Sequence, residues 1–422
     1  MSEPDLHVNL YDLILPLAIT TDMMSPAVAN HHMKVAYLTL RLAEELEFSP
    51  LEQCSVVTAA ALHDIGAFSL SDRIDLLEFE LKDPKQHANA GYLLLREFPP
   101  FEEIAKIVKY HHVPWNHGRG EIKENGAVSR GAHLVHLADR TAVLIPRGEH
   151  VLRFVDTICE SIREHRGSRF VPEYVDALDR LAHRDYIWLE LASGSMERAL
   201  RKSFIGHIQE LDLDMLLAFA QLMCRVIDFK SEFTATHSSG LVAVSAELAR
   251  LRGFSSEDCQ KMRIAAYLHD VGKLAVPSEV LEKPARLSED EWHIMRSHVY
   301  YTYHILESFE ALGPITNWSA LHQERLDGTG YPFGYRAVDL PHGSRIMAVS
   351  DVFVAITEDR PYREGMPPAR AQAILTESAK AEKLDPDVVQ TLLDHYDEMS
   401  AVRSTAQEQA RAEYRAFQEE LQ

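Results

Sequence analysis

Cysteine and long apolar runs are both scarce in this sequence. Its four cysteines are spread over 422 residues without a C-x-x-C pair, which favours a reduced, cytoplasmic environment. The longest apolar stretch, residues 211–229, is broken by Asp212, Asp214, Arg225 and Asp228, so we expect an amphipathic helix there and no membrane span. The N-terminus has no basic region followed by an apolar core, so no signal peptide is predicted.

Positive charge is also in short supply. Against 64 Asp and Glu residues stand only 43 Lys and Arg residues, which gives a formal charge of −21. So acidic a surface disfavours contact with duplex nucleic acid or anionic lipid. An anionic substrate would need metal ions or local arginines to reverse the field in its site. With 46% hydrophobic and 25% charged residues, the chain has a globular composition, and its length predicts two or three domains.

Alternating strand patterns are rare, whereas helical periodicity recurs along the chain. Apolar residues return every three or four positions in Val35–Leu46, Leu241–Leu251, Ile346–Ile356 and Ala371–Leu375. We therefore predict an all-α protein. Gly272 follows one apolar run and is expected to stop a helix, and the glycine-rich residues 328–334 are expected to form a loop.

Histidines and aspartates occur in two matching sets. The first set is His32, His63, Asp64, His87, His111 and Asp139, and the second is His237, His269, Asp270, His298, His322 and Asp351. His87 and His111 are 24 residues apart (111 − 87), as are His298 and His322 (322 − 298). The repeat predicts two tandem helical bundles, at 1–145 and 211–405, joined by a helical connector at 146–210 and followed by a charged helical tail at 406–422.

The second set favours a metal site. Asp351 lies among apolar residues of a predicted helix, and the pair His269-Asp270 ends another apolar run. A buried carboxylate needs a partner, because an unpaired buried charge costs several kcal/mol. A shared cation would satisfy both groups, and imidazole and carboxylate ligands suit Fe, Mn or Zn.

Three segments of the second half together form a specific pattern. They are His269-Asp270-Val271-Gly272-Lys273, His322-Gln323-Glu324 followed by Asp327-Gly328-Thr329-Gly330-Tyr331-Pro332, and Asp359-Arg360-Pro361-Tyr362-Arg363. Residues 214–405 thereby resemble the HD-GYP family of HD-superfamily phosphodiesterases. The resemblance implies an all-α HD bundle that hydrolyses cyclic di-GMP or, in some members, cyclic GMP-AMP.

The resemblance also assigns roles to individual residues. It implies two divalent metals, Fe or Mn first and Zn, Ni or Co as alternatives, held by His237, His269, Asp270, His298, His322 and Asp351. Asp270 would bridge the two metals that activate water, which makes Asp270 and Lys273 the expected catalytic residues. Lys273, Arg360 and Arg363 are expected to bind phosphate, and Tyr331 is expected to border the substrate pocket.

Two positions depart from the family pattern. Gln323 stands where most members have a second adjacent histidine, and Phe233 replaces a glutamate that members with a third metal carry. An amide is a poor ligand beside imidazole or carboxylate. We therefore predict two metals, not three, in the second half.

The first half keeps a candidate metal set but lacks the substrate-binding pattern. The set is His32, His63, Asp64, His87, His111, His112 and Asp139. Ala67 replaces the lysine, and neither the glycine-tyrosine-proline loop nor the arginine pair is present. This half is interpreted either as a regulatory domain that binds metal or nucleotide, as a hydrolase for another phosphoester, or as a decayed duplicate with a structural role.

Three functions are consistent with these patterns. The first is hydrolysis of cyclic di-GMP to 5′-pGpG in bacterial signalling, with onward cleavage to GMP left open. The second is hydrolysis of 3′,3′-cyclic GMP-AMP. The third is a sensor or scaffold that binds the nucleotide with little catalysis, an alternative that Gln323 keeps open. The expected partner is a cyclic dinucleotide, with a second copy of the chain or a signalling protein as further candidates, and no duplex nucleic acid or membrane.

Overall fold

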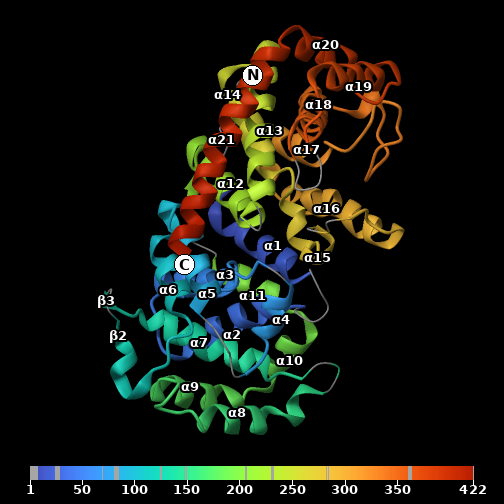
Figure 1. The fold of residues 1–422 in the computed structure, drawn as a ribbon. Helices are drawn as coiled ribbons and strands as arrows, with labels where there is room; N and C mark the ends of the chain where they lie inside the picture. The colour runs from blue at the N-terminus through green and yellow to red at the C-terminus, as the bar shows by residue number, and fades with distance from the viewer. Residues whose placement is uncertain are drawn as a thin grey trace. The chain divides into compact units, whose positions relative to one another are not determined.

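The computed structural model describes residues 8–23, 29–68, 70–79, 85–123, 126–146, 148, 150–204, 207–229, 232–281, 283, 285–359 and 364–421. Helices make up nearly all of the regular structure in these residues (Figure 1). The strands described are two residues long, with β1 (Val8–Asn9) paired to β4 (Glu210–Leu211) and β2 (Ile122–Lys123) paired to β3 (Gly126–Ala127). The all-α prediction is confirmed. Among the described residues, no helix is both long and apolar enough to cross a bilayer.

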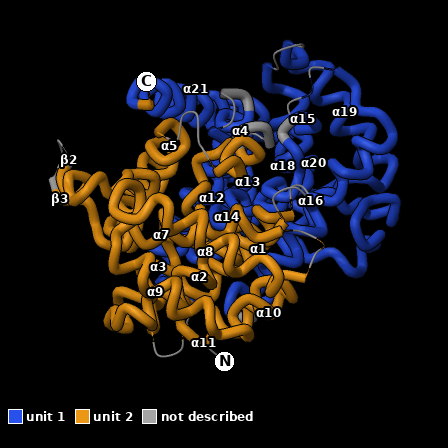
Figure 2. The backbone as a smooth tube through the Cα atoms, turned by 90° about the horizontal axis from the view of Figure 1, so that it is seen from below, with its two compact units in different colours: residues 1–8, 211–420, 422 blue, residues 9–210, 421 orange. Residues whose placement is uncertain are grey.

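The chain forms two compact units, residues 9–210 and residues 211–420, which we call the N-terminal and C-terminal units (Figure 2). The predicted connector is helical and lies inside the N-terminal unit, where α9 and α11 pack against α2. The predicted tail is the second part of a single long helix, α21, that begins at Tyr396. Arg225 of α12 forms a 3.0 Å ion pair with Glu413 of α21, so this helix packs on the C-terminal unit.

The N-terminal unit is organised around α2, α3 and α7, which pack against one another. Its helices are α1 (Leu10–Asp22), α2 (His31–Glu45), α3 (Pro50–Leu62), α4 (Leu70–Asp75), α5 (Lys85–Leu95), α6 (Glu102–Tyr110), α7 (Arg130–Val143), α8 (Val155–Arg163), α9 (Pro172–Ala182), α10 (Asp185–Ser193) and α11 (Met196–Ser203), with 3₁₀ turns η1 (Pro99–Phe101), η2 (Asn116–Glu121) and η3 (Val151–Arg153). The start of α3 is fixed locally, because Ser49 and Glu52 form a capping box and Pro50 occupies the first helical position.

In the C-terminal unit, α13 packs on α14 and α18, and α12 packs on α14. Its helices are α12 (Leu213–Asp228), α13 (Glu232–Leu251), α14 (Ser256–Leu268), α15 (Ser278–Leu281), α16 (Glu289–Glu307), α17 (Pro314–Ala320), α18 (His342–Thr357), α19 (Pro368–Lys380), α20 (Pro386–Asp394) and α21 (Tyr396–Leu421), with 3₁₀ turns η4 (Val271–Ala275), η5 (Glu310–Leu312) and η6 (Ala337–Asp339). The periodic segments predicted as helices lie in α2, α13, α18 and α19.

Gly272 has a different role from the helix stop that the sequence suggested. Helix α14 ends at Leu268, and Gly272 lies inside the turn η4. A Cβ atom on Gly272 would come within 2.0 Å of the His298 carbonyl oxygen, so only glycine lets α16 approach this closely. The N-terminal unit repeats the contact, because a Cβ on Gly66 would lie 2.2 Å from the His87 carbonyl. In both units this approach brings a histidine of the next long helix towards the HD aspartate.

Candidate metal centres and substrate site

In the C-terminal unit, the six predicted ligands converge from separate elements. His237 lies on α13, His298 on α16 and Asp351 on α18, while His269-Asp270 follows α14 and His322 follows α17. Ligand atoms of His237, His269 and Asp351 lie within 4.8 Å of one another, as do those of His269, Asp270 and His322. The two groups share His269, and His298 joins them because its Nε2 lies 3.2 Å from Asp270 Oδ1.

The histidine rings are oriented by a repeated backbone contact. The Nδ1 atoms of His269, His298 and His322 lie 2.7, 2.5 and 2.6 Å from the carbonyl oxygens of Ala266, Met295 and Ser319, each three residues earlier. A proton on Nδ1 that is donated to a carbonyl leaves the Nε2 lone pair facing the cluster. These histidines therefore have both the residue type and the tautomer that metal binding through Nε2 requires.

Asp270 lies at the centre of this cluster. Its Oδ2 is 2.8 Å from His269 Nε2 and 2.5 Å from Lys273 Nζ. Although burial opposes the charged form, His269 and Lys273 hold the pKa of Asp270 well below its ordinary value. Burial likewise opposes the charged Lys273, but Asp270 raises the pKa of that ammonium group. The site thus contains an anionic carboxylate with a permanent cation beside it.

Three other residues of the cluster, His237, His322 and Asp351, also have displaced pKa values. Burial would lower the pKa of His237, but the carboxylates of Glu358 and Asp351 raise it to about 10. Burial and the neighbouring His269 lower the pKa of His322 to about 4, which keeps its ring neutral at pH 7. Asp351 stays ionised, because the hydrogen bond from His237 overcomes the opposing effect of burial on its pKa.

The glycine-rich loop is held by a carboxylate that we did not predict. Buried Glu324 accepts hydrogen bonds from the backbone N–H groups of Phe333, Gly334 and Tyr335, at 2.7, 3.1 and 3.1 Å. A Cβ on Gly330 would lie 2.4 Å from the Cα of Glu324, so this position of the loop requires glycine. The loop is therefore fixed to the segment that carries His322.

Gln323 connects the loop to the cluster. Its Nε2 donates to Asp351 Oδ2 at 2.9 Å, and its Oε1 accepts from the Tyr331 hydroxyl at 3.1 Å. Both ends of the amide are thus engaged in hydrogen bonds. The side chain of Phe233, which motivated the two-metal prediction with Gln323, lies outside the described residues, as do Arg360 and Arg363. The metal number and the arginine phosphate contacts remain predictions.

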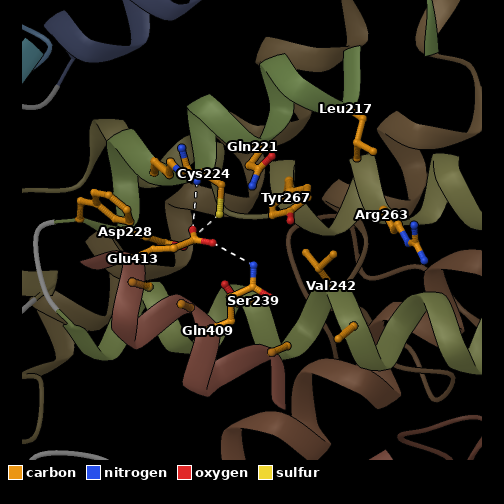
Figure 3. A pocket seen from close by; sticks show the side chains of 16 residues that line it. Leu217, Gln221, Cys224, Asp228, Ser239, Val242, Arg263, Tyr267, Gln409 and Glu413 are labelled. Atoms are coloured by element: carbon orange, nitrogen blue, oxygen red, sulfur yellow. Dashed lines mark hydrogen bonds and ion pairs between the residues drawn. The ribbon is translucent and has the colours of Figure 1, made fainter. Parts of the chain in front are cut away.

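Two further buried carboxylates were missed from the sequence. Glu358 accepts from Nδ1 of His237 at 3.0 Å and is 3% exposed. Asp228, which we noted only as a break in an apolar stretch, accepts from the Cys224 thiol at 3.0 Å, and burial raises its pKa. Asp228 and Cys224 line a cavity of about 310 Å³ between α12, α13, α14 and α21 (Figure 3). The signal for Asp228 was its spacing, nine residues before His237 (237 − 228).

The N-terminal unit contains an even denser cluster. Asp64 lies 3.2 Å from His63 Nε2, 3.4 Å from His87 Nε2 and 3.7 Å from His111 Nε2. Three groups of ligand atoms fall within 4.8 Å, and they are Asp64-His87-His111-His112, His31-His63-Asp64 and His63-His111-Asp139. His63 and His111 repeat the Nδ1 contact with carbonyl oxygens three residues earlier, at 2.8 and 2.6 Å. This set also has the tautomers that metal ligation requires.

His31 occupies the position that we assigned to His32. His31 Nε2 lies 3.3 Å from Asp139 Oδ1, whereas His32 Nδ1 lies 2.6 Å from Asp22 Oδ1. His31 precedes His63 by 32 residues (63 − 31), as His237 precedes His269 (269 − 237). Adjacent helical residues point about 100° apart, so a shift of one position changes the partner. The spacing alone would have identified His31.

The N-terminal cluster is enclosed by protein. Arg140 donates to Asp139 Oδ2 and also to the carbonyl oxygens of Leu76 and Glu78, at 2.9 and 2.6 Å. Arg169 donates to the carbonyl oxygen of Phe79 at 3.0 Å, so two arginines hold the segment that follows α4. Several buried ligand atoms have no hydrogen-bond partner in the described part of the chain, namely His31 Nε2, His63 Nε2, Asp64 Oδ1, His112 Nδ1 and Asp139 Oδ1. Unsatisfied donors and acceptors that face one another fit a bound cation.

Comparison with known proteins finds an HD domain in each half of the chain. Two family models described as HD domain match residues 28–144 and 221–388. The 3′3′-cGAMP-specific phosphodiesterase 1 of Vibrio cholerae is 32% identical over 409 residues, which cover 92% of each chain. A cyclic di-GMP phosphodiesterase response regulator of Xanthomonas campestris is 34% identical over 203 residues, or 47% of this chain and 52% of that one. A solved V. cholerae phosphodiesterase specific for cyclic GMP-AMP has the same fold, with a TM-score of 0.63 at 23% identity over 93% of this chain and 98% of that chain.

Proposed function

Since this chain belongs to the HD-GYP family of cyclic-dinucleotide phosphodiesterases, we propose that its C-terminal site hydrolyses one 3′,5′ phosphodiester bond of a cyclic dinucleotide. The observation that carries the proposal is the convergence of six histidine and aspartate ligands around Asp270, beside Lys273 and the loop that contains Tyr331. An anionic substrate suits this site, because its cations reverse the field of an otherwise acidic chain.

The first candidate substrate is 3′,3′-cyclic GMP-AMP. The relative that matches along 92% of both chains is named for that substrate. Cyclic di-GMP, which the sequence analysis placed first, is the second candidate, because relatives named for it match about half of this chain or less. In either case the expected first product is a linear dinucleotide with a 5′ phosphate.

Each residue of the site has a defined task in this proposal. His237, His269, Asp270, His298, His322 and Asp351 would hold two divalent transition metals, Fe or Mn first. When bound, such metals activate water and offset the negative charge on the phosphoryl oxygens. Lys273 adds positive charge next to Asp270 and so stabilises the charge that develops on the phosphate. Glu358 keeps the His237 ring in one orientation through its Nδ1.

The test is direct. Purified protein loaded with Mn²⁺ or Fe²⁺ under reducing conditions is incubated separately with cyclic GMP-AMP and cyclic di-GMP, and the products are separated by chromatography. We expect metal-dependent formation of the linear dinucleotide, faster with cyclic GMP-AMP. Tight binding of either nucleotide without any product would favour the sensor or scaffold alternative instead.

For the N-terminal unit we propose a metal centre that has no role in dinucleotide hydrolysis. The unsatisfied buried atoms of His31, Asp64 and Asp139 support metal binding over a decayed duplicate, because a decayed site would be expected to lose or to pair its buried polar groups. The segment held by Arg140 and Arg169 leaves the cluster buried, which disfavours entry of a dinucleotide. Metal analysis and thermal unfolding of Asp64→Ala test this centre without reference to turnover. An unchanged metal content would refute it.

A further inference from the structure

Aromatic side chains gather where α16 faces the glycine-rich loop. Trp292 at the N-terminal end of α16 is 45% exposed, and Tyr335 of the loop is 39% exposed. Phe333 packs between the two elements, with its ring 4.9 Å from that of Tyr303 and 5.1 Å from that of Tyr335. Large aromatic rings left open to solvent beside a catalytic cluster are typical of a ligand-binding surface.

Tyr331 connects this aromatic surface to the candidate metal site through hydrogen bonds. Its hydroxyl donates to Gln323 Oε1 at 3.1 Å, and the same amide donates to the ligand Asp351 at 2.9 Å. Burial and the charges of Asp351 and Asp270 raise the pKa of Tyr331 to about 12, so the hydroxyl keeps its proton at neutral pH. Two hydrogen bonds therefore separate the ring of Tyr331 from a metal ligand.

Tyr331 also contacts a cation and a second aromatic ring. The guanidinium of Arg296 lies 4.6 Å from the centre of the Tyr331 ring, and the ring of Trp292 approaches Tyr331 edge-on at 6.3 Å. Trp292 and Arg296 are four residues apart on α16, so they share one face of the helix. Among the described residues, Arg296 has no hydrogen bond or ion pair, in a chain with 64 acidic residues. A cation–π contact leaves its N–H donors available.

We propose that Trp292 and Arg296 form a subsite for one purine base of the substrate, with a preference for guanine. Trp292 offers an exposed ring on which a base can stack, and stacking favours any purine. Arg296 offers the paired N–H donors that match O6 and N7 of guanine, whereas adenine presents a donor in place of O6. Gln323 acts here as a positioning residue, because it fixes Tyr331, and with it Arg296, relative to Asp351. The inference rests on the proposed function and adds to it a site that reads the base.

The experiment compares substrates with and without bases. Trp292→Ala and Arg296→Ala are assayed with cyclic GMP-AMP, cyclic di-GMP, cyclic di-AMP and the base-free diester bis(p-nitrophenyl) phosphate. We expect Arg296→Ala to raise KM for the two guanine-containing substrates by about 5- to 150-fold. Its effect on cyclic di-AMP should be smaller, and the base-free diester should be unaffected. Trp292→Ala should raise KM for all three dinucleotides by a similar factor and again spare the base-free diester.

Tyr300→Ala is the matched control, because this 48% exposed ring lies on the same helix but stacks on His304 at 6.1 Å. It should leave every KM unchanged. A rise in KM for the base-free diester with Arg296→Ala would overturn the proposal in favour of a phosphate contact. Unchanged KM values for the dinucleotides would overturn it as well. If the wild type turns over no dinucleotide, the proposed function fails separately, and calorimetric binding of the same nucleotides to the same variants decides on the subsite.

Discussion

The two units carry the same cluster in different surroundings. In the C-terminal unit the HD aspartate contacts Lys273 Nζ, and the position of a further histidine is taken by Gln323, which links Asp351 to Tyr331. In the N-terminal unit the corresponding positions are Ala67 and His112, and the cluster lies under a segment held by arginines. In one copy this position thus contacts the loop, and in the other it carries a candidate metal ligand in an enclosed cluster.

The partner of the buried carboxylate beside each cluster also differs. Asp22 lies nine residues before His31 (31 − 22), as Asp228 lies nine before His237, so these two buried carboxylates correspond. Asp228 is close enough to Lys273 for the ammonium group to lower its pKa, although burial dominates and raises it. Asp22 instead contacts the imidazole of His32 at 2.6 Å. Loss of the lysine in one copy is therefore accompanied by a histidine on the preceding helix, which keeps a hydrogen-bonding partner near the carboxylate but provides no fixed charge for a phosphate.

The largest expected effect comes from removing each HD aspartate in turn. Asp270→Ala should reduce turnover of the cyclic dinucleotide by roughly 10⁴-fold or more, because Asp270 lies at the centre of the residues that would hold the metals. Asp64→Ala should leave turnover within about twofold and remove the metal of the N-terminal unit instead. The measurements are product formation and metal content per chain, on variants checked for folding by circular dichroism. Loss of turnover in Asp64→Ala with retention in Asp270→Ala would show that the chemistry belongs to the other unit.

Much of this difference between the two units could be predicted from the sequence, because the two copies could be compared residue by residue. For each of the six predicted ligands of the C-terminal copy, we assigned a counterpart in the N-terminal copy. Five of these six counterparts are residues of the N-terminal cluster. The exception, His32 for His31, arose because both residues are histidine and only the helical phase separates them. Glu358 and Asp228 were missed because they belong to no repeated motif that we recognised. Glu358 contacts the predicted ligand His237 through tertiary packing, and Asp228 contacts Cys224.

Substitution of His112 and Gln323, which follow His111 and His322, should show how the two units differ in metal binding. His112 has its Nε2 3.1 Å from His87 Nε2, within the N-terminal group of ligands, so His112→Gln should weaken metal binding there by roughly 10- to 100-fold. In the C-terminal unit we expect two metals, and Gln323→His should at most add a weakly held third. Metal titration against a chelator measures each effect. For Gln323→His, the titration is carried out in an Asp64→Ala background, so that only the C-terminal unit binds metal. Three tightly bound metals in the C-terminal unit with Gln323 present would contradict the prediction.

Proton binding should affect the metal-free units in parallel. His87 and His322 have pKa values lowered to about 4, by burial first and then by neighbouring histidines. Below pH 6.5 the unfolded state therefore binds more protons than the folded state, and stability falls as the pH drops from 6.5 to 4. Each shift corresponds to a loss on the order of 3 kcal/mol. Denaturant unfolding of chelator-treated protein measures this loss of stability between pH 6.5 and 4. We expect a smaller loss in the His87→Gln and His322→Gln variants.

At alkaline pH each unit should lose stability through the deprotonation of a different histidine. The pKa of His63 is raised to about 9 by Asp64 against the effect of burial, and that of His237 to about 10 by Glu358 and Asp351. The stability from these charged rings is complete below pH 6.5 and is lost as the pH rises through the folded-state pKa. Glu358→Gln should lower the pKa of His237 in an NMR titration and leave that of His63 unchanged. An unchanged pKa of His237 would show that Asp351 alone sustains its charge.

The smallest effects are expected at the helix that leads into each HD pair, where the two copies are most alike. Ser49 lies 14 residues before His63 (63 − 49), and Ser255 lies 14 before His269 (269 − 255). Each serine caps its helix, since the Glu52 N–H donates to Ser49 Oγ at 3.4 Å and the Asp258 N–H donates to Ser255 Oγ at 3.0 Å.

Ser49 also receives a return contact that Ser255 does not match. In each pair the serine hydroxyl donates to the carboxylate at 2.7 Å, and at Ser49 the backbone N–H also donates to Glu52 Oε2, at 2.9 Å. Each substitution to alanine should cost about 1 kcal/mol of stability, and Ser49→Ala slightly more than Ser255→Ala. Both caps are exposed and lie a full helix away from the clusters, so metal content and turnover should stay at wild-type values. Denaturant unfolding measures the cost, and a change in turnover with Ser49→Ala would mean that the stability of the enclosed unit is coupled to catalysis in the other.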